Sequence, residues 1–346
     1  MQSNTRSACP NLAHAGPSAR RWSAAFGAAR LAGRAGLPES APHPMTTVEP
    51  AISVPGRLRT YASFVRLEHT LFSLPLILAG VFSTSGPAMS AARWALVAVA
   101  AVSARTAAMT LNRVIDRRID AANPRTRARE LPAGTMRLGE ALALLASSAA
   151  LYLAACAALG SWYVRVAVVP LAVFALYPYL KRWTPLCHLG VGLALALSPL
   201  AGYAAAHPEL RASGTAWTLA GFALFWVSGF DIIYATLDET FDREAGLHSA
   251  VAWLGRARAL RLSWALHLMA MASLAWAAWR VALGAGSFRP VWAAITLLGV
   301  AGTWLLLWLE QRWAEDVNLA FFKTNVVVGL LVLATVLAAR MASGGF

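Results

Sequence analysis

The chain has 346 residues, of which 58% are hydrophobic and 13% charged, and its mean hydropathy is +0.55. A typical soluble domain is roughly a quarter charged and less than half apolar, so this composition excludes a water-soluble fold and indicates an integral membrane protein. The 30 Lys and Arg against 16 Asp and Glu give a net charge of +14. A chain this apolar offers no solvated face to a duplex, so we expect no nucleic-acid partner and assign the excess charge to membrane topology.

Residues 1–44 differ from the rest of the chain, because they are rich in Ala, Gly, Arg, Ser and Pro and contain no sustained apolar run. This composition does not match a secretory signal peptide, although its Arg content would also suit an organellar transit peptide. We expect a disordered tail or an over-extended start, with Met45 as the alternative first residue. Residues 45–346 are then expected to form one membrane domain.

Long apolar stretches recur between short polar breaks from residue 63 onward, each near the length that crosses a hydrocarbon core of about 30 Å. They are continuous in apolarity and do not alternate, which predicts helices and not a barrel. The predicted fold class is an all-α integral membrane protein, a bundle of nine transmembrane helices at about 63–83, 92–113, 138–159, 162–180, 187–206, 215–236, 262–283, 290–310 and 321–340.

The Lys and Arg residues near the ends of these stretches lie mostly on one side of the predicted bundle. By the positive-inside rule, this bias places the Met45 end inside. We therefore expect a multi-pass membrane protein, with the connections after the second and sixth helices facing the cytoplasm.

Half of the acidic residues lie between Asp116 and Glu130 and between Asp231 and Glu244, at the inner ends of two predicted helices. At about 100° per residue, two acids of the first group form one stripe along their helix with an asparagine that precedes them: Asn112, Asp116 and Asp120. The same arithmetic places the second group within a narrow sector: Asp231, Asp238 and Asp242.

Carboxylates that share one helix face near a membrane repel each other unless a cation lies between them. Mg²⁺ is the expected cation, because it takes oxygen ligands and usually combines one or two carboxylates with phosphate oxygens and water. Basic residues suited to the same phosphates follow at Arg125 and Arg129, and at Lys181 and Arg182. Together with the apolar interior they predict a lipid diphosphate substrate. The alternative is that the carboxylates form surface salt bridges with neighbouring Arg residues.

Arg105 lies seven residues before Asn112, on the same face of an otherwise apolar helix. An arginine within a membrane span is a functional candidate, so we expect it in the cavity, with burial against a structural carboxylate as the alternative. The histidines lack metal-ligand spacing and are predicted to be structural or interfacial, with His248 the one candidate for lining the site: His69, His188, His207, His248 and His267.

Three segments carry a family resemblance. From Asn112 to Gly134 the chain reads NRVIDRRIDAANPRTRARELPAG, from Tyr177 to Arg182 it reads YPYLKR, and from Asp231 to Ser249 it reads DIIYATLDETFDREAGLHS. In this order they resemble the signatures of the UbiA superfamily of intramembrane aromatic prenyltransferases, over roughly residues 60 to 340. Many members carry Asp directly after the Asn, where this chain has Arg113. The Asn-Arg form is similar to the bacterial 4-hydroxybenzoate polyprenyltransferase-like subgroup.

The resemblance implies a central cavity opening near the cytoplasmic side, in which two Asp-rich motifs bind Mg²⁺ and a polyprenyl diphosphate. The expected metal ligands, which also act in catalysis, are Asp116, Asp120, Asp231, Asp238 and Asp242. Tyr177 and Lys181 are expected to contact the diphosphate or to assist its ionisation. The expected substrate-binding residues are Asn112, Arg125, Arg129, Arg66, Arg105 and Tyr234, of which Arg66 and Arg105 are the candidates for the acceptor's carboxylate and Tyr234 for stabilising the prenyl cation.

The predicted reaction is Mg²⁺-dependent transfer of a polyprenyl group to a small aromatic acid, a quinone precursor, within the lipid bilayer. The first choice of acceptor is 4-hydroxybenzoate, and the alternative is 1,4-dihydroxy-6-naphthoate. Haem, chlorophyllide or a glycerol phosphate lipid would preserve the same diphosphate motifs. A membrane transporter is the rival from another class, since charges inside a membrane also mark ion pathways, but the sequence has no convincing internal repeat.

Overall fold

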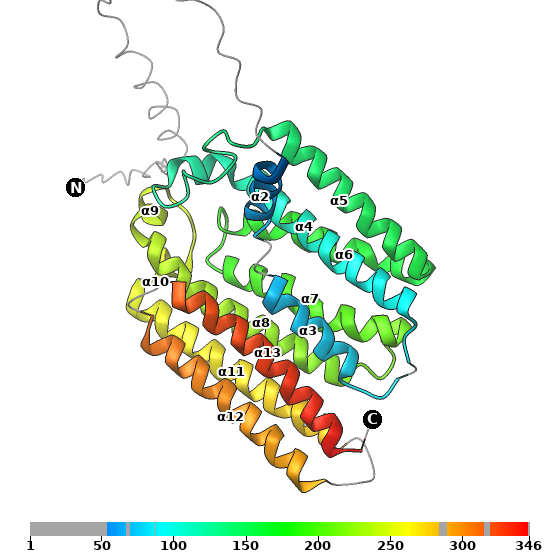
Figure 1. Cartoon of the computed structure of the whole chain (residues 1–346). Coiled ribbons are helices and arrows are strands. Elements are labelled where there is room, and N and C mark those ends of the chain that lie inside the picture. Colours follow the sequence, from blue (N-terminus) through cyan, green and yellow to red (C-terminus); the bar gives the residue numbers. More distant parts are fainter. Residues whose placement is uncertain (1–53, 67–69, 87, 284–288, 315–318, 345–346) are drawn as a thin grey trace, which may run out of the picture. The chain divides into compact units, whose positions relative to one another are not determined.

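The computed structural model describes residues 54–66, 70–86, 88–283, 289–314 and 319–344. The predicted tail at 1–44 and the boundary after it lie outside these residues. Every regular element within them is a helix, which confirms the all-α prediction. The helices form a bundle in which α3 (Thr70–Phe82) and α7 (Cys187–Ala206) lie between the helices that precede α7 and those that follow it (Figure 1).

The helices follow the predicted apolar stretches closely after the first. The first half of the chain contains α2 (Val54–Phe64), α3 (Thr70–Phe82), α4 (Ala91–Ala122), α5 (Leu138–Leu159), α6 (Ser161–Leu180) and α7 (Cys187–Ala206). The second half contains α8 (Gly214–Ala235), α9 (Glu239–Glu244), α10 (Ala250–Leu254), α11 (Arg256–Leu283), α12 (Pro290–Arg312) and α13 (Leu319–Ala342). Two short 3₁₀ turns, η3 (Pro208–Leu210) and η4 (Thr236–Asp238), flank α8.

In the part of the chain that the structure describes, 8 helices are long and apolar enough to cross a membrane. The prediction of one continuous helix over 63–83 is wrong, because α2 ends at Phe64 and α3 begins at Thr70. Between them Arg66 adopts a left-handed backbone conformation, with φ of 50°, which no helix continues through. The 13 residues of α3 are about 20 Å long, short of a full span. The predicted count of nine spans is therefore not confirmed.

The connections that carry the two acidic motifs meet at one end of the bundle. The backbone N–H of His248, which follows the second motif, donates to the carbonyl of Lys181 at the end of α6, at 2.7 Å. α2 packs at this end as well, since the fully buried Phe64 contacts Met136 and Ala141 beside the first motif. The prediction that this end faces the cytoplasm stays a prediction.

The helices α3 and α7 touch through their backbones. A Cβ atom added to Gly80 would lie 2.0 Å from the carbonyl oxygen of Pro199, and one added to Gly202 would lie 1.9 Å from that of Ile77. Helices in membranes associate closely where such small residues meet. Glycine is therefore required on both sides of this α3–α7 seam.

The main apolar core lies among α3, α8, α11, α12 and α13, around the fully buried Phe222, Trp226 and Leu274. A group of buried polar side chains lies beside it. His267 and Glu310 are both fully buried, with His267 Nε2 3.9 Å from Glu310 Oε2. These contacts join α11 to α12.

Candidate active site

One cavity of about 1240 Å³ is lined by all the residues expected to bind metal or substrate or to act in catalysis, but not by Arg182. Its walls come mainly from α4, α6, α7 and the end of α8. The expected residues that line it are Arg66, Arg105, Asn112, Asp116, Asp120, Arg125, Arg129, Tyr177, Lys181, Asp231, Tyr234, Asp238 and Asp242. The sequence therefore identified residues that share one space, while their individual roles stay predictions.

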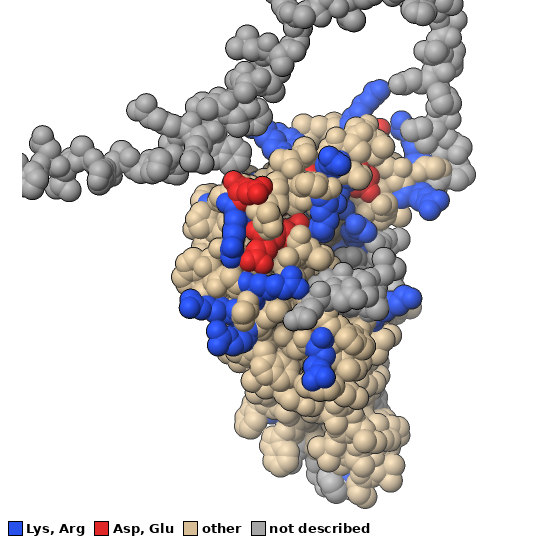
Figure 2. Space-filling model, turned by 90° about the vertical axis from the view of Figure 1, so that its left-hand side faces the viewer, with Lys and Arg blue, Asp and Glu red and all other residues tan. Residues whose placement is uncertain are grey.

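The cavity has two chemically different ends. Along α4 its lining extends from Asp120 back to Val97, which corresponds to about 35 Å of helix. We call the part around the acidic motifs the charged end. The remainder is the apolar end, which is lined by Val97, Ala101, Trp162, Tyr163, Ala201 and neighbouring residues. Figure 2 shows the same division on the surface, with acidic side chains gathered among basic ones at one end.

The first acidic motif has the geometry that its spacing predicted. Because α4 continues to Ala122, Asn112, Asp116 and Asp120 lie on one helix face. The side chain of Asp116 is 4% exposed, and its oxygens accept from Lys181 Nζ at 2.6 Å and from Arg182 Nη2 at 3.1 Å. Thus two cations compensate one deeply buried carboxylate.

Asp120 has a basic partner of its own. Arg129 Nη1 donates to Asp120 Oδ1 at 2.8 Å, from the loop that follows α4. The side chain of Asp120 is 6% exposed, so this contact also neutralises a buried charge.

The second acidic motif departs from the predicted geometry. α8 ends at Ala235, residues 236–238 form a 3₁₀ turn, and a new helix begins at Glu239. The prediction that Asp231, Asp238 and Asp242 share one continuous α-helical face is therefore wrong. The turn changes their relative orientation, yet all three still line the cavity.

Asp238 connects the two motifs. It accepts from Arg125 Nε at 2.8 Å and from Asn123 Nδ2 at 2.9 Å, both in the loop after α4. The hydrogen bond to Asp238 raises the pKa of Arg125 above its usual value, so this guanidinium remains charged. The contact closes the charged end between α4 and α8.

The carboxylates do not form a ready-made metal cluster. Within the described ranges, no three His, Cys, Asp or Glu side chains lie close enough together to hold a metal ion. Asp116, Asp120 and Asp238 each contact an Arg or Lys. The donor chemistry nevertheless fits Mg²⁺, since carboxylate and amide oxygens face the cavity and Mg²⁺ commonly needs one or two of them when phosphate oxygens complete its shell.

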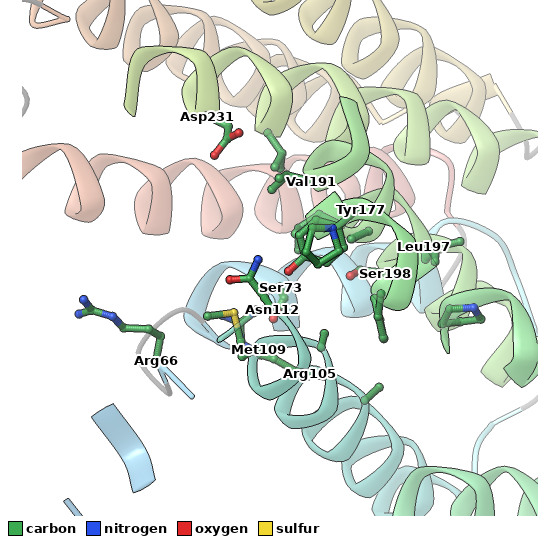
Figure 3. Close-up of a pocket in the computed structure, with 18 of the residues that line it drawn as sticks. Arg66, Ser73, Arg105, Met109, Asn112, Tyr177, Val191, Leu197, Ser198 and Asp231 are labelled. Carbon is green, nitrogen blue, oxygen red and sulfur yellow. The ribbon is translucent and has the colours of Figure 1, made fainter. Parts of the chain in front are cut away.

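The remaining predicted residues lie on different walls. Figure 3 shows Arg105 and Asn112 on α4 facing the same cavity as Tyr177 of α6, with Asp231 contributed by α8. Arg66 is exposed and lies apart from them, in the connection between α2 and α3.

The structure adds residues that the sequence did not single out as site residues. Asn123 directly follows α4 and holds Asp238, and its position after the first stripe was the available signal. His188 was predicted to be structural, but its Nδ1 lies 2.7 Å from Asp231 Oδ2 and it lines the cavity. Nothing in the local spacing indicated this, because the two residues are 43 positions apart. His248, the one histidine considered as a candidate for lining the site, is not among the lining residues.

Arg113 occupies the position where many relatives of the resembled family carry Asp. It is 4% exposed, lies 3.5 Å from Glu130 and packs over the ring of Phe64. Here the arginine therefore ties α4 to α2 and to the loop of the first motif.

Comparison with known proteins places these features in context. Residues 73–339 match the model of the UbiA prenyltransferase family. The chain is similar to the 4-hydroxybenzoate octaprenyltransferase of Sodalis glossinidius (strain morsitans), at 30% identity over 236 residues, which cover 67% of this chain and 78% of that protein.

Two solved structures share the fold. The apo structure of a UbiA homolog from Aeropyrum pernix K1 is 35% identical, with a TM-score of 0.67, and the match covers 80% of this chain and 98% of that one. A UbiA homolog from Archaeoglobus fulgidus bound to GPP and Mg²⁺ is 22% identical, with a TM-score of 0.63 and coverage of 82% and 99%.

Proposed function

Because the chain belongs to the UbiA prenyltransferase family, we propose that it transfers a polyprenyl group from a polyprenyl diphosphate to 4-hydroxybenzoate, with Mg²⁺ as cofactor. The chain is an integral membrane prenyltransferase, which excludes the alternative prediction of a membrane transporter. The identity of the acceptor, the metal and the residue roles are the parts we propose.

The observation that carries the proposal is the division of the cavity. A diphosphate requires cations, and Arg125, Arg129 and Lys181 all line the charged end. A polyprenyl chain requires a long apolar space, which the apolar end supplies next to it. One amphiphilic substrate fits both ends at once.

The ion pairs of the charged end suggest how a diphosphate would be held. Lys181, Arg125 and Arg129 each pair with an aspartate. Phosphate oxygens would compete for these cations, and the aspartates would then be available to a divalent cation. Mg²⁺, when bound, would neutralise charge that builds up on the diphosphate. The Archaeoglobus fulgidus homolog bound to GPP and Mg²⁺ supports this pairing of ligands.

In the reaction, the bond between prenyl carbon 1 and the diphosphate oxygen breaks, and the diphosphate leaves with the electron pair. The electron-rich ring carbon beside the phenol hydroxyl then bonds to carbon 1, and loss of the ring proton restores aromaticity. The basic side chains stabilise the leaving group, and the apolar walls exclude water from the allylic cation. Tyr177 and Tyr234 line the cavity, and their rings would stabilise that cation.

The acceptor is assigned from the relatives and from charge. The curated relative described above is named 4-hydroxybenzoate octaprenyltransferase. A benzoate carboxylate needs a cationic partner, for which Arg105 within the cavity and Arg66 at its mouth are our candidates. We further propose that the charged end faces the cytoplasm of a bacterial inner membrane, as the distribution of basic residues favours.

The test uses membranes that contain the full chain, supplied with octaprenyl diphosphate and either 4-hydroxybenzoate or 1,4-dihydroxy-6-naphthoate, with Mg²⁺ or EDTA. Mass spectrometry should detect the prenylated benzoate when Mg²⁺ is supplied and not when EDTA is added. Asp116→Ala and Asp238→Ala should abolish it. Glu140→Ala is the matched control, because Glu140 pairs with Arg57 outside the cavity. A product with the naphthoate alone, or no product with either acceptor while the diphosphate still binds, would contradict the proposed acceptor.

A further inference from the structure

His188, the second residue of α7, connects two parts of the charged end. Its imidazole is 5% exposed and lies between Asp231 of α8 and the first turn of α10. Nδ1 lies 2.7 Å from Asp231 Oδ2, and Nε2 lies 3.1 Å from the backbone nitrogen of Ala250. Both ring nitrogens are therefore occupied.

These two contacts determine where the ring proton sits. The backbone N–H of Ala250 can only donate, so Nε2 must accept and carries the lone pair. Nδ1 is then the ring nitrogen that donates to Asp231. The Ala250 amide thus selects the tautomer that holds the aspartate.

The contact of Asp231 differs from those of the other acidic residues of the site. Asp116, Asp120 and Asp238 contact Arg or Lys, which cancel their charge. Asp231 is instead held through one oxygen by the imidazole of His188, and its side chain remains 31% exposed. Asp231 is therefore oriented where it meets the cavity.

The backbone around His188 is itself held in place. The hydroxyl of Ser228 on α8 donates to the His188 carbonyl at 3.1 Å, and Cys187 Sγ contacts the carbonyl of His248 at 3.3 Å. A ring anchored on both sides is suited to orienting a carboxylate. In metal sites, groups that hydrogen-bond to a ligand typically change metal affinity or activity by about 10- to 100-fold when removed.

We propose that His188 is a positioning residue, which orients Asp231 toward a divalent cation bound with the diphosphate. This inference rests on the proposed prenyl transfer. It assigns no contact between His188 and the substrate, since the histidine acts through Asp231.

The experiment compares His188→Leu with His188→Asn in the full-length protein. Leu and Asn branch at the same atom and have similar shapes, but the Asn amide nitrogen occupies the position of Nδ1 and can donate to Asp231. The probe is Mn²⁺ in the presence of inorganic diphosphate, titrated by electron paramagnetic resonance. The apparent Kd should rise about 10- to 100-fold in His188→Leu, and most of that loss should be recovered in His188→Asn. The kcat of prenyl transfer should follow the same order.

A double-mutant cycle tests whether His188 acts through Asp231. In an Asp231→Asn background, His188→Leu should weaken Mn²⁺ binding much less than it does alone. His267→Leu is the control for loss of a buried histidine, because His267 lies outside the cavity and should lower the melting temperature without changing the apparent Kd.

Several results would overturn the inference. One is wild-type affinity for Mn²⁺ in His188→Leu. Another is an equal loss of Mn²⁺ affinity in the Leu and Asn variants. The third is a loss of affinity in the double mutant that equals the product of the two single-mutant losses. Because Mn²⁺ binding needs no acceptor, failure of transfer to 4-hydroxybenzoate with the binding pattern intact would contradict the proposed acceptor alone. Normal transfer without the binding pattern would contradict the role of His188 alone.

Discussion

The two ends of the cavity are built in opposite ways. At the charged end, Asp116 has three polar partners: Asn112 one turn earlier on α4, and Lys181 and Arg182 after α6. Each of these contacts is directional. At the apolar end, the walls are mostly small or aliphatic side chains such as Ala101 and Ala201, whose contacts have no preferred direction.

Because of this difference, the two ends recognise different parts of the substrate. Directional contacts between charged groups determine which head group binds, and they lose much of their effect when one partner changes. Apolar walls determine how much space a tail has, and they tolerate substitutions of similar volume. We therefore expect substitutions at the charged end to change the rate, and those at the apolar end to change the choice of prenyl chain.

The largest effect is expected from Lys181→Met. Loss of this cation removes a partner of Asp116 and a donor for the departing diphosphate, so kcat should fall about 10²- to 10³-fold. The chain contains one other lysine, the exposed Lys323, and Lys323→Met should retain wild-type turnover. Steady-state assays with a fixed acceptor measure both. Equal rates for the two variants would show that Lys181 has no role in the reaction.

A smaller effect is expected from Arg125→Lys. Arg125 contacts both carboxylate oxygens of Asp238 through a planar fork, and an ammonium group cannot reproduce that geometry. Losing one charge-assisted hydrogen bond should lower kcat/KM for the polyprenyl diphosphate about 10- to 100-fold. Arg127→Lys, an exposed change in the same loop and outside the cavity, is the control. If Arg125→Lys is fully active, charge alone suffices at this position.

At the apolar end, Ala201→Phe should change chain-length preference. Ala201 faces the cavity from α7, and a phenyl ring there would occupy space that a long tail needs. The ratio of kcat/KM for octaprenyl to geranyl diphosphate should fall by about 10-fold or more. Ala157→Phe on α5, which is exposed and outside the cavity, should leave the ratio unchanged. Competition between the two donors, followed by mass spectrometry, gives the ratio directly. An unchanged ratio in Ala201→Phe would show that the tail lies elsewhere.

The smallest effect is expected from Tyr163→Phe. The ring that lines the cavity remains, while the hydroxyl loses its contacts with the Ala204 carbonyl, at 2.8 Å, and with Arg93. Stability should fall by about 1 kcal/mol, visible as a lower melting temperature in detergent. Tyr179→Phe, at an exposed ring outside the cavity, should change it less. A larger fall in melting temperature in Tyr179→Phe than in Tyr163→Phe would contradict the importance of this buried contact.

The first acidic motif was predictable because its geometry is local. Asn112, Asp116 and Asp120 lie within one uninterrupted helix, so helical spacing alone placed them on one face. The partners of these residues come from elsewhere. Lys181 reaches Asp116 from the end of α6, and only packing of α6 against α4 determines that contact.

The errors have physical causes of the same kind. Asp238 lies in a 3₁₀ turn, and its hydrogen bonds to Asn123 and Arg125 are long-range contacts that no helical repeat encodes. The predicted span at 63–83 treated the apolar residues on both sides of Arg66 as one helix, whereas the left-handed backbone of Arg66 separates α2 from α3. The orientation of Asp231 by His188 depends on the α7–α8 contact in the same way.

The seam between α3 and α7 constrains how related enzymes could diverge in the substrates they accept. Backbone atoms meet directly at Gly80 and Gly202, so no choice of side chain there can draw the two helices closer. Any larger side chain would force them apart and disturb the cavity walls that both helices provide. Adaptation to a longer or shorter prenyl chain is therefore expected at other positions of the cavity wall, on α4, α6, α8 and the cavity-facing side of α7.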